Sequence, residues 1–166
     1  KKVIRELKKI MAQAEEGTFE IRLADQDVHL AVERTLTEAL GDLGKKVHTC
    51  RSRNDQVALD LRLFAREELL GTLTEAAELA SALLAFGKKY QKVPMVGRTH
   101  VQPGMPSSVG LWASAQAESL LDDCVMLVNA YELNDQSPLG SAASYGVPLE
   151  IDRELVSDLL GFHCPV

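Results

Sequence analysis

Apolar residues recur at three- and four-residue steps along most of this chain, the spacing that places side chains on one face of an α-helix. The first such pattern runs over residues 1–17, with lysines and arginines on an opposite, solvated face, and it ends at Gly17. A second helix is predicted to begin at Asp25 or Asp27 and to end at Gly41 or Gly44. Its apolar line consists of Val28, Val32, Leu36 and Leu40.

The longest helical pattern spans about residues 54–90, where the chain has no proline and a single glycine, Gly71. Its main apolar line consists of Val57, Leu61, Ala65, Leu69, Leu73, Ala76, Ala80 and Leu84. Further leucines and a phenylalanine widen this line until apolar residues cover most of the helix surface. A helix of this length extends over ~50 Å, and its apolar surface requires other helices around it. We therefore expect a bundle that includes helices from other chains.

The last third of the chain alternates loops and helices. Loops rich in glycine, proline and small residues are expected over 91–105 and 134–148, the second exposed and flexible. A long helix should begin at Pro106 and reach about residue 133, and a short one should cover 152–160. No segment shows the alternation of apolar and polar residues that is typical of a β-strand. The predicted fold class is therefore all-α, a bundle of long helices.

We expect residues 1–166 to form a single helical region with three parts. Residues 1–53 contain the N-terminal helices and a first polar loop. Residues 54–135 contain the long bundle helices and the loop between them, and residues 136–166 contain a small-residue loop and a short helix. Because the chain starts without a methionine and stops just after a short apolar segment, we expect it to be truncated at both ends.

Composition and charge narrow the possible functions. A net charge of −6 and a pI near 5.2 argue against general nucleic-acid binding, which needs a basic face. The three cysteines form no CxxC pair, so neither a zinc site nor a disulfide framework is expected, and a reducing cytoplasm is the simplest location. We expect no run to be long and apolar enough to span a membrane.

A dense polar cluster, His48-Thr-Cys-Arg-Ser-Arg-Asn-Asp-Gln-Val57, precedes the longest helix. One interpretation is a charged loop in which Asn54 or Asp55 caps that helix. The other is an anion site at the positive helix N-terminus, which would hold a carboxylate or phosphate. Its side chains would be Arg51 or Arg53, Ser52 and Asn54.

A second candidate is Thr99-His100, in a loop bounded by glycine and proline. A histidine there can transfer protons near neutral pH, although a loop histidine bonded to the backbone is the alternative. His29 lies one residue from the apolar line of the second helix and is a weaker candidate. The histidines lack metal-site spacing, and no nucleophile turn or dinucleotide fingerprint is present. Anion binding with acid–base chemistry points to proton abstraction beside a carboxylate.

These segments resemble those of a known family. The segment 48–57 resembles the first signature of argininosuccinate lyases, in the aspartase/fumarase superfamily, and Gly97-Arg-Thr-His-Val-Gln102 resembles the second. Asp25-Gln-Asp-Val-His-Leu30 is similar to a third family segment, and Pro138-Leu-Gly-Ser-Ala-Ala142 to the family's Pro-Leu-Gly-Ser loop. The four segments occur in family order and cover nearly the whole chain.

The resemblance implies a cofactor-free, metal-free lyase that cleaves argininosuccinate to arginine and fumarate by β-elimination, in arginine biosynthesis. It implies that the substrate carboxylates are bound by Ser52, Arg53 and Asn54. It makes Thr99 a substrate-binding residue, His100 the acid–base histidine and His29 a further pocket residue. It also implies a cytoplasmic homotetramer whose sites are shared between subunits, with no nucleic-acid or membrane partner.

That assembly agrees with an expectation drawn from the residues alone. The two polar clusters flank a predicted helix of about 37 residues, too long for them to meet within one chain if it is straight.

The chain also departs from the family pattern. It lacks the third signature, a mobile loop that supplies a catalytic serine and a lysine, so the 166-residue chain by itself is expected to be inactive. Arg98 stands where many members have tyrosine, and Pro103-Gly-Met-Pro106 differs from the commoner sequence. The alternatives are another lyase of the superfamily, acting on adenylosuccinate, aspartate or fumarate, and a non-catalytic crystallin-like structural relative.

Overall fold

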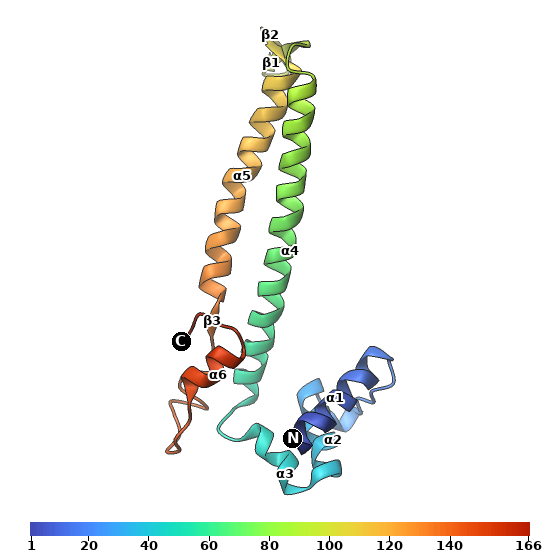
Figure 1. Cartoon of the computed structure of the whole chain (residues 1–166), viewed down its shortest axis with the longest axis vertical. Helices are drawn as coiled ribbons and strands as arrows, with labels where there is room; N and C mark the ends of the chain where they lie inside the picture. The colour runs from blue at the N-terminus through green and yellow to red at the C-terminus, as the bar shows by residue number, and fades with distance from the viewer. The chain divides into compact units, whose positions relative to one another are not determined.

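The computed structural model describes all 166 residues, and its chain forms two compact units. The first unit contains Lys1–Asp60, Ser137–Gly161 and Pro165–Val166. The second contains Leu61–Gln136 and Phe162–Cys164. Each unit is described by itself below, with element labels as in Figure 1.

The first unit is built from short helices. They are α1 (Lys2–Glu15), η1 (Leu23–Asp25), α2 (Val28–Leu40), α3 (Asp42–Lys45), η2 (Lys46–His48), the start of α4 (Arg53–Lys89) and α6 (Arg153–Leu159). Ile10 of α1 and Ala31 and Leu36 of α2 are buried between these helices. The short helices α3 and η2 were not predicted as separate elements, since the sequence left the end of the second helix open between Gly41 and Gly44.

The ends of α2 follow the capping rules. The Asp27 carboxylate accepts a hydrogen bond from the Leu30 backbone N–H at 2.7 Å, which selects Asp27 over Asp25 as the N-cap. Gly41 ends the helix with a φ of 60°. Immediately afterwards α3 packs back on α2 so closely that a Cβ on Gly44 would lie 2.4 Å from the Leu36 carbonyl oxygen.

The second unit is a helical hairpin. Its elements are the rest of α4, β1 (Pro94–Thr99), β2 (Gln102–Ser108) and α5 (Val109–Asn134) (Figure 1). The helices approach closely at one end, where a Cβ on Gly87 would lie 3.3 Å from that of Ala113. At the other end Asn134 donates a hydrogen bond to the Arg62 carbonyl at 2.7 Å. The helical pattern therefore predicted both long helices correctly, and the all-α fold class is confirmed.

The segment between these helices is the clearest correction to the sequence prediction. It is not a loop but an antiparallel β-hairpin, with Pro94 paired to Ser108 and Thr99 to Gln102. Consequently Pro106 lies in β2 and does not begin α5. Ser108 is the N-cap of α5 instead, with its hydroxyl accepting from the Leu111 N–H at 3.1 Å.

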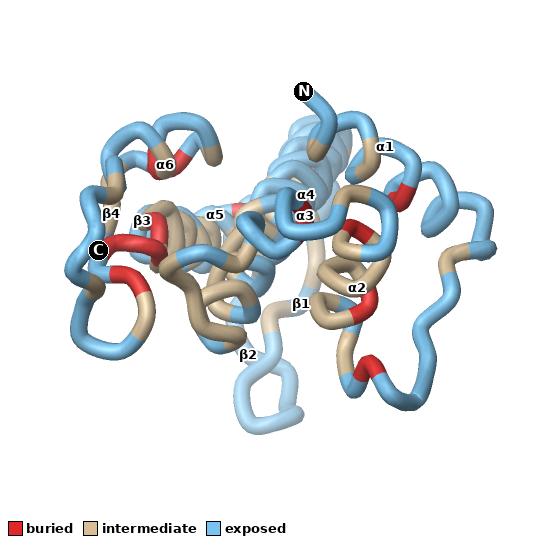
Figure 2. Tube along the Cα trace, turned by 90° about the horizontal axis from the view of Figure 1, so that it is seen from below, coloured by how far each residue is buried: buried red, intermediate tan, exposed pale blue.

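Both long helices expose apolar side chains. Along α4 only Ala80 and Gly87 are buried, and Figure 2 shows how few positions of the chain are buried at all. The exposed large apolar residues of α4 and α5 include Leu61, Phe64, Leu70, Leu79, Leu84, Leu111, Trp112, Val125, Met126 and Leu133. Soluble monomers rarely expose contiguous apolar surface of this kind, so these helices require partners.

The expectation that no run is long and apolar enough to cross a membrane was wrong for α4. By length and composition it qualifies, with an 18-residue window of mean hydropathy 1.4. One such helix is weak support for a membrane span, because a helix at the centre of a soluble bundle passes the same test. Glu75 and Glu78 also interrupt its apolar surface.

The segment 136–148 is not the exposed, flexible loop that its small residues suggested. Ser137, Leu139 and Ala142 are buried. The backbone N–H of Val166 donates to the Ser137 carbonyl at 2.9 Å, and Gly140 leaves no room for a Cβ beside Val166. Small residues here permit close backbone approach, which their composition alone does not reveal.

Candidate functional site

The polar cluster 48–57 leads directly into the first turn of α4. Ser52 and Asp55 satisfy each other: the Ser52 N–H donates to the Asp55 carboxylate at 2.7 Å, and the Asp55 N–H donates to the Ser52 hydroxyl at 3.3 Å. This reciprocal pair is a capping box. The capping role therefore falls to Ser52 with Asp55, and not to Asn54, which is exposed and makes no side-chain hydrogen bond within the chain.

Arg53, the first residue of α4, is surrounded by acceptors. Its Nε lies 3.1 Å from Asp27 Oδ2 and its Nη2 lies 3.9 Å from Glu33 Oε2. Its Nη1 donates to the side-chain oxygen of Gln56. The guanidinium thus makes one hydrogen bond within its own helix and lies near two carboxylates, Asp27 at the N-cap of α2 and Glu33 within it.

Two histidine–carboxylate pairs line a cavity of about 260 Å³ next to this arginine. His48 Nδ1 lies 2.7 Å from Glu33 Oε2, and His29 Nε2 lies 3.1 Å from Asp60 Oδ2. The cavity wall also contains Val28, Val32, Leu36, Val47 and Gln56. His29, which the resemblance makes a further pocket residue, is among the residues that line this cavity.

The small-residue segment is joined to the same polar cluster. Arg51 Nη1 donates to the Leu139 carbonyl at 2.8 Å, and the Ala143 N–H donates to the Cys50 carbonyl at 3.0 Å. Cys50 itself has a φ of 64°. Arg51 is therefore used to hold a backbone segment, which leaves its guanidinium less available to an anion.

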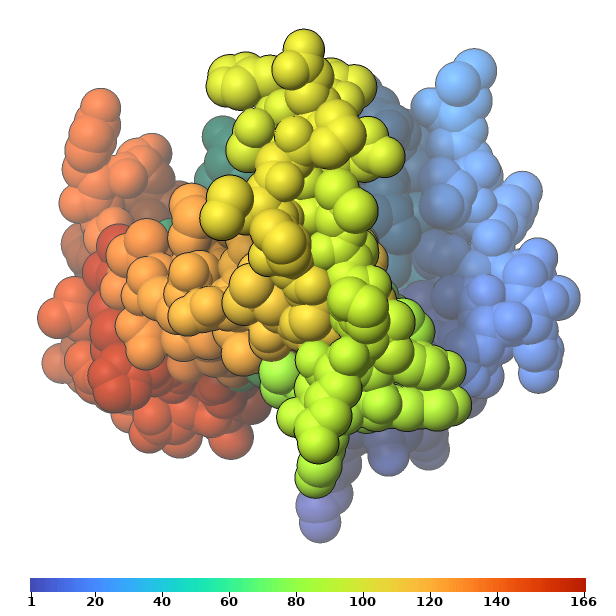
Figure 3. Space-filling view, turned by 90° about the horizontal axis from the view of Figure 1, so that it is seen from above, coloured from blue at the N-terminus to red at the C-terminus, as the bar shows by residue number.

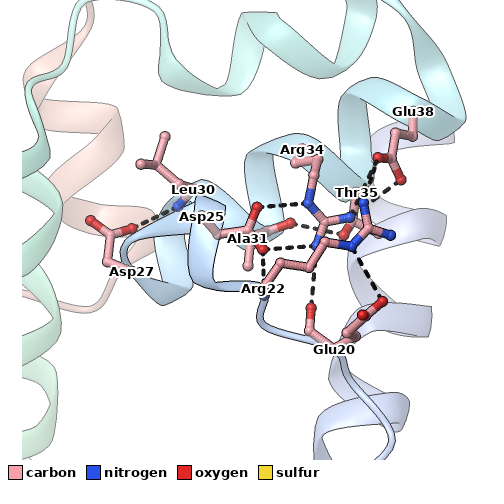
Figure 4. Close-up of polar contacts among 9 residues, drawn as sticks. All are labelled: Glu20, Arg22, Asp25, Asp27, Leu30, Ala31, Arg34, Thr35 and Glu38. Atoms are coloured by element: carbon pink, nitrogen blue, oxygen red, sulfur yellow. Dashed lines mark hydrogen bonds and ion pairs between the residues drawn. The ribbon is translucent and has the colours of Figure 1, made fainter.

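A second ion-pair network holds the start of α2 (Figure 4). The Asp25 carboxylate accepts from Arg34 and from the backbone N–H of Arg22, at 2.8 Å for the latter. The Arg34 guanidinium lowers the pKa of Asp25 to about 2, helped by the Arg22 N–H and opposed by burial. Arg34 also reaches Glu38 at 3.3 Å and the Glu20 carbonyl at 3.2 Å. This network fixes the backbone just before Asp27.

Thr99 and His100 lie at the tip of the β1–β2 hairpin. His100 and Val101 form a two-residue turn with φ values of 50° and 65°. Left-handed backbone is uncommon for non-glycine residues and strained for a β-branched valine. The tip lies at the surface of its unit, nearest the viewer in Figure 3, and Val101 is 91% exposed. His100, the predicted acid–base histidine, is therefore exposed in a strained turn.

The structure therefore groups the predicted site residues as follows. Ser52, Arg53, Asn54 and His29 belong to the first unit, and Thr99 and His100 to the second. No group of three or more histidine, cysteine or acidic side chains is arranged to hold a metal ion.

Sequence reasoning missed the partners of these residues. They are Asp27, Glu33, His48 and Asp60. The sequence signal for them was weak, because the pattern predicts Asp27 only as a possible start of the second helix.

Comparison with known proteins defines the class. The family model described as a lyase matches residues 1–165, and the chain belongs to this lyase family. Among curated relatives, it is 49% identical to the argininosuccinate lyase of Phocaeicola vulgatus over 160 residues, covering 96% of this chain and 36% of that protein. It is 42% identical to the argininosuccinate lyase of Thermotoga neapolitana over 162 residues, covering 98% of this chain and 41% of that protein.

A solved structure supports the same class. A variant of EDDS lyase with bound fumarate matches with a TM-score of 0.88 and 26% sequence identity, covering 99% of this chain and 32% of that chain. The chain therefore spans well under half the length of each of these relatives.

Proposed function

We propose that the full-length protein is an argininosuccinate lyase that cleaves argininosuccinate to arginine and fumarate. The observation that carries this proposal is the 49% identity to a curated argininosuccinate lyase over 96% of the chain. The first signature, His48 to Val57, supports the proposal as well. It comprises the segment just before α4 and the first residues of that helix.

The reaction is a β-elimination. A base removes a proton from the carbon beside a substrate carboxylate, and the electrons left on that carbon are delocalised into the carboxylate. The bond between the adjacent carbon and the guanidino nitrogen then breaks, and an acid protonates the departing nitrogen, which leaves as arginine. Hydrogen-bond donors fixed where the carboxylate gains charge stabilise this intermediate.

The residue roles in this proposal come from the family resemblance. Ser52, Arg53 and Asn54 serve the substrate carboxylates, and the helix N-terminus on which they lie favours anions. Thr99 binds substrate, and His100 is the acid–base histidine at an exposed turn, where a substrate can reach it. His29, on the wall of the cavity beside α2, is a further residue of the substrate pocket. The site uses no metal and no organic cofactor.

The proposed assembly is a cytoplasmic homotetramer with sites shared between subunits. Two observations support it. α4 is unbroken over 37 residues, an axial length of ~55 Å, and the two signature segments flank it in the sequence. In addition, α4 and α5 expose large apolar side chains that need covering. Partners are therefore small-molecule substrate and other copies of the chain, without nucleic acid or membrane.

Other lyase substrates form the second candidate function. The EDDS lyase variant was solved with bound fumarate, so a protein of this fold with a different name accommodates that dicarboxylate. A lyase for adenylosuccinate, aspartate or fumarate itself would share the dicarboxylate part of the site. A non-catalytic crystallin-like relative would keep the fold and lose the activity.

A substrate panel tests the proposal. The full-length protein is incubated with argininosuccinate, adenylosuccinate and aspartate, and fumarate release is followed by its ultraviolet absorbance. Fumarate should appear rapidly from argininosuccinate and not from the other two. Release from another substrate alone would replace the proposed function, and no release from any would favour the structural relative. The isolated 166-residue chain should release none.

A further inference from the structure

We propose that Arg51 is a positioning residue for the proposed carboxylate site. It fastens the segment 137–143 to the turn that leads into α4, and so holds Ser52 and Asn54 where a substrate carboxylate can meet them. Arg51 itself does not contact the substrate. The inference rests on the proposed function for the identity of the site, and it gives a role to a segment to which the resemblance assigned none.

The Arg51 side chain reaches a segment far along the chain. Its Nη1 donates to the Leu139 carbonyl oxygen at 2.8 Å, and the arginine is half-buried. A hydrogen bond from an ionised donor is shorter and stronger than one between neutral groups. This contact is therefore suited to holding two segments of irregular backbone together.

A second hydrogen bond joins the same two segments one residue earlier. The Ala143 N–H donates to the Cys50 carbonyl oxygen at 3.0 Å. Cys50 has a φ of 64°, a left-handed conformation that a non-glycine residue keeps only where the surrounding contacts determine it. The bonds at Cys50 and Arg51 are such contacts. The segment 137–143 therefore stabilises a turn that its own residues disfavour.

The segment 137–143 is anchored independently of Arg51. Three of its side chains are buried, those of Ser137, Leu139 and Ala142. The Val166 N–H donates to the Ser137 carbonyl at 2.9 Å, and Gly140 lies so close to the Val166 carbonyl that a Cβ would not fit. A segment fixed by these contacts can act as a support for the turn beside it.

Ser52 lies between this support and the helix. Its N–H donates to the Asp55 carboxylate at 2.7 Å, and its hydroxyl accepts from the Asp55 N–H at 3.3 Å. The Ser52 hydroxyl still has its own O–H to donate, and the exposed Asn54 amide makes no hydrogen bond within the chain. Without the Arg51 contact the turn is held mainly from the helix side. A misplacement of about 1 Å in such donors can cost on the order of a hundredfold in rate.

Fumarate binding to the full-length protein tests the role of Arg51. Arg51→Met keeps a long, unbranched side chain without its donor, and it should weaken fumarate binding about tenfold. Arg51→Lys can still donate to one carbonyl, so its binding should stay within about threefold of that of the unsubstituted protein. Calorimetry measures the fumarate dissociation constant, and thermal unfolding reports stability separately.

Gly140→Ala disturbs the same contact from the other side. The added Cβ would meet the Val166 carbonyl oxygen, so the peptide group that carries the Leu139 carbonyl must move. This variant should also weaken fumarate binding about tenfold, and combining it with Arg51→Met should give no more than the worse single loss, because both act through one contact. Should Gly140→Ala fail to fold, Leu139→Val takes its place, with a smaller loss in the same direction.

Three results overturn the inference. In the first, Gly140→Ala leaves fumarate binding unchanged, or its effect multiplies with that of Arg51→Met to about a hundredfold; Arg51 then acts independently of the segment. In the second, Arg51→Met lowers the unfolding temperature and leaves fumarate binding unchanged, which makes Arg51 a structural residue only. In the third, Arg51→Lys loses as much binding as Arg51→Met, so a single donated hydrogen bond is not what Arg51 contributes.

Controls make the same chemical changes elsewhere. Arg5→Met removes a guanidinium that is 70% exposed and pairs with the adjacent Glu6, and Gly71→Ala adds a Cβ that meets nothing within 4 Å. Both should leave fumarate binding unchanged. An unsubstituted protein that binds fumarate but leaves argininosuccinate intact refutes the proposed function and not this inference, and one that binds no fumarate refutes both.

Discussion

Asp25 and Arg34 form a two-pronged ion pair in which Arg34 Nε lies 2.7 Å from Asp25 Oδ1 and Nη2 lies 3.0 Å from Oδ2. Asp25 is buried, and Arg34 is held within α2. The pair therefore connects the segment before α2 to the second turn of that helix. Asp27, which contacts Arg53, follows Asp25 by two residues. The ion pair therefore helps to fix the backbone that carries Asp27.

Stability should depend on acid through Asp25. Its pKa is lowered from 3.8 to about 2 in the folded chain, first by the Arg34 guanidinium. A lowered carboxyl pKa contributes stability that is fully present above pH 3.8 and is lost as the pH falls through about 2. Asp25→Asn should therefore lower the free energy of unfolding near neutral pH, with the deficit shrinking as the pH approaches 2. Urea unfolding at a series of pH values measures this; a deficit that stays constant contradicts it.

Gly110 should tolerate no side chain. A Cβ there would lie 2.6 Å from the Gln91 Cα and 3.0 Å from the Gly87 carbonyl oxygen, both backbone atoms. Gly110→Ala should cost about 1–3 kcal/mol of unfolding free energy. Gly71→Ala is the matched control, since its Cβ meets nothing within 4 Å in the same hairpin, and it should gain about 0.5–1 kcal/mol. Denaturant unfolding of both variants distinguishes them, and equal behaviour would argue against this helix approach.

The turn at the tip of the β1–β2 hairpin should be stabilised by glycine. Val101 has a φ of 65° and is 91% exposed, so Val101→Gly loses almost no packing and relieves backbone strain. We expect a gain of about 1 kcal/mol or more in unfolding free energy. Val96→Gly, in β1 of the same hairpin, should instead destabilise, because glycine weakens a strand interior. A loss of stability at both positions would show that the turn is not strained.

His100 should contribute to turnover and not to folding. If it transfers a proton in the elimination, His100→Gln in the full-length protein should reduce kcat by about 10²–10⁴-fold with a smaller change in KM. His163→Gln is the matched control, because that histidine is exposed and its recorded contact is through its backbone N–H. Steady-state kinetics on argininosuccinate separates the two. Near-normal kcat in the His100 variant would remove it from the acid–base role.

The helices were predictable because their signals are local. Leu36 and Ala113 recur at helical spacing and are fully buried, and Gly17 and Gly161, with φ values of 69° each, follow the ends of α1 and α6. The β1–β2 hairpin gave no such signal. Its strands contain Pro94, several further prolines and glycines, and a register shift after Val96, so no alternating pattern appears. Its turn residues are also not the usual asparagine and glycine.

The sequence predicts which segments carry candidate site residues, but it does not predict the contacts that those residues make. The sequence identified Arg51 and Arg53 as candidates for anion binding, because arginines before a helix are suited to it. The Arg51 contact with the Leu139 carbonyl joins residues far apart in the chain, and the Asp27–Arg53 contact joins two helices. Such partners are set by tertiary packing, which no short window of sequence encodes.

The unbroken course of α4 also limits how this sequence can change. One residue inserted near Gly71 would turn every later side chain of the helix by ~100° and move it ~1.5 Å along the axis, so residues that now approach α5 would face elsewhere. An insertion of seven residues would nearly restore the facing, at ~20° from its original direction. Substitutions on the exposed surface carry no such penalty. We therefore expect related sequences to vary in residue type along α4 while preserving the number of residues in it.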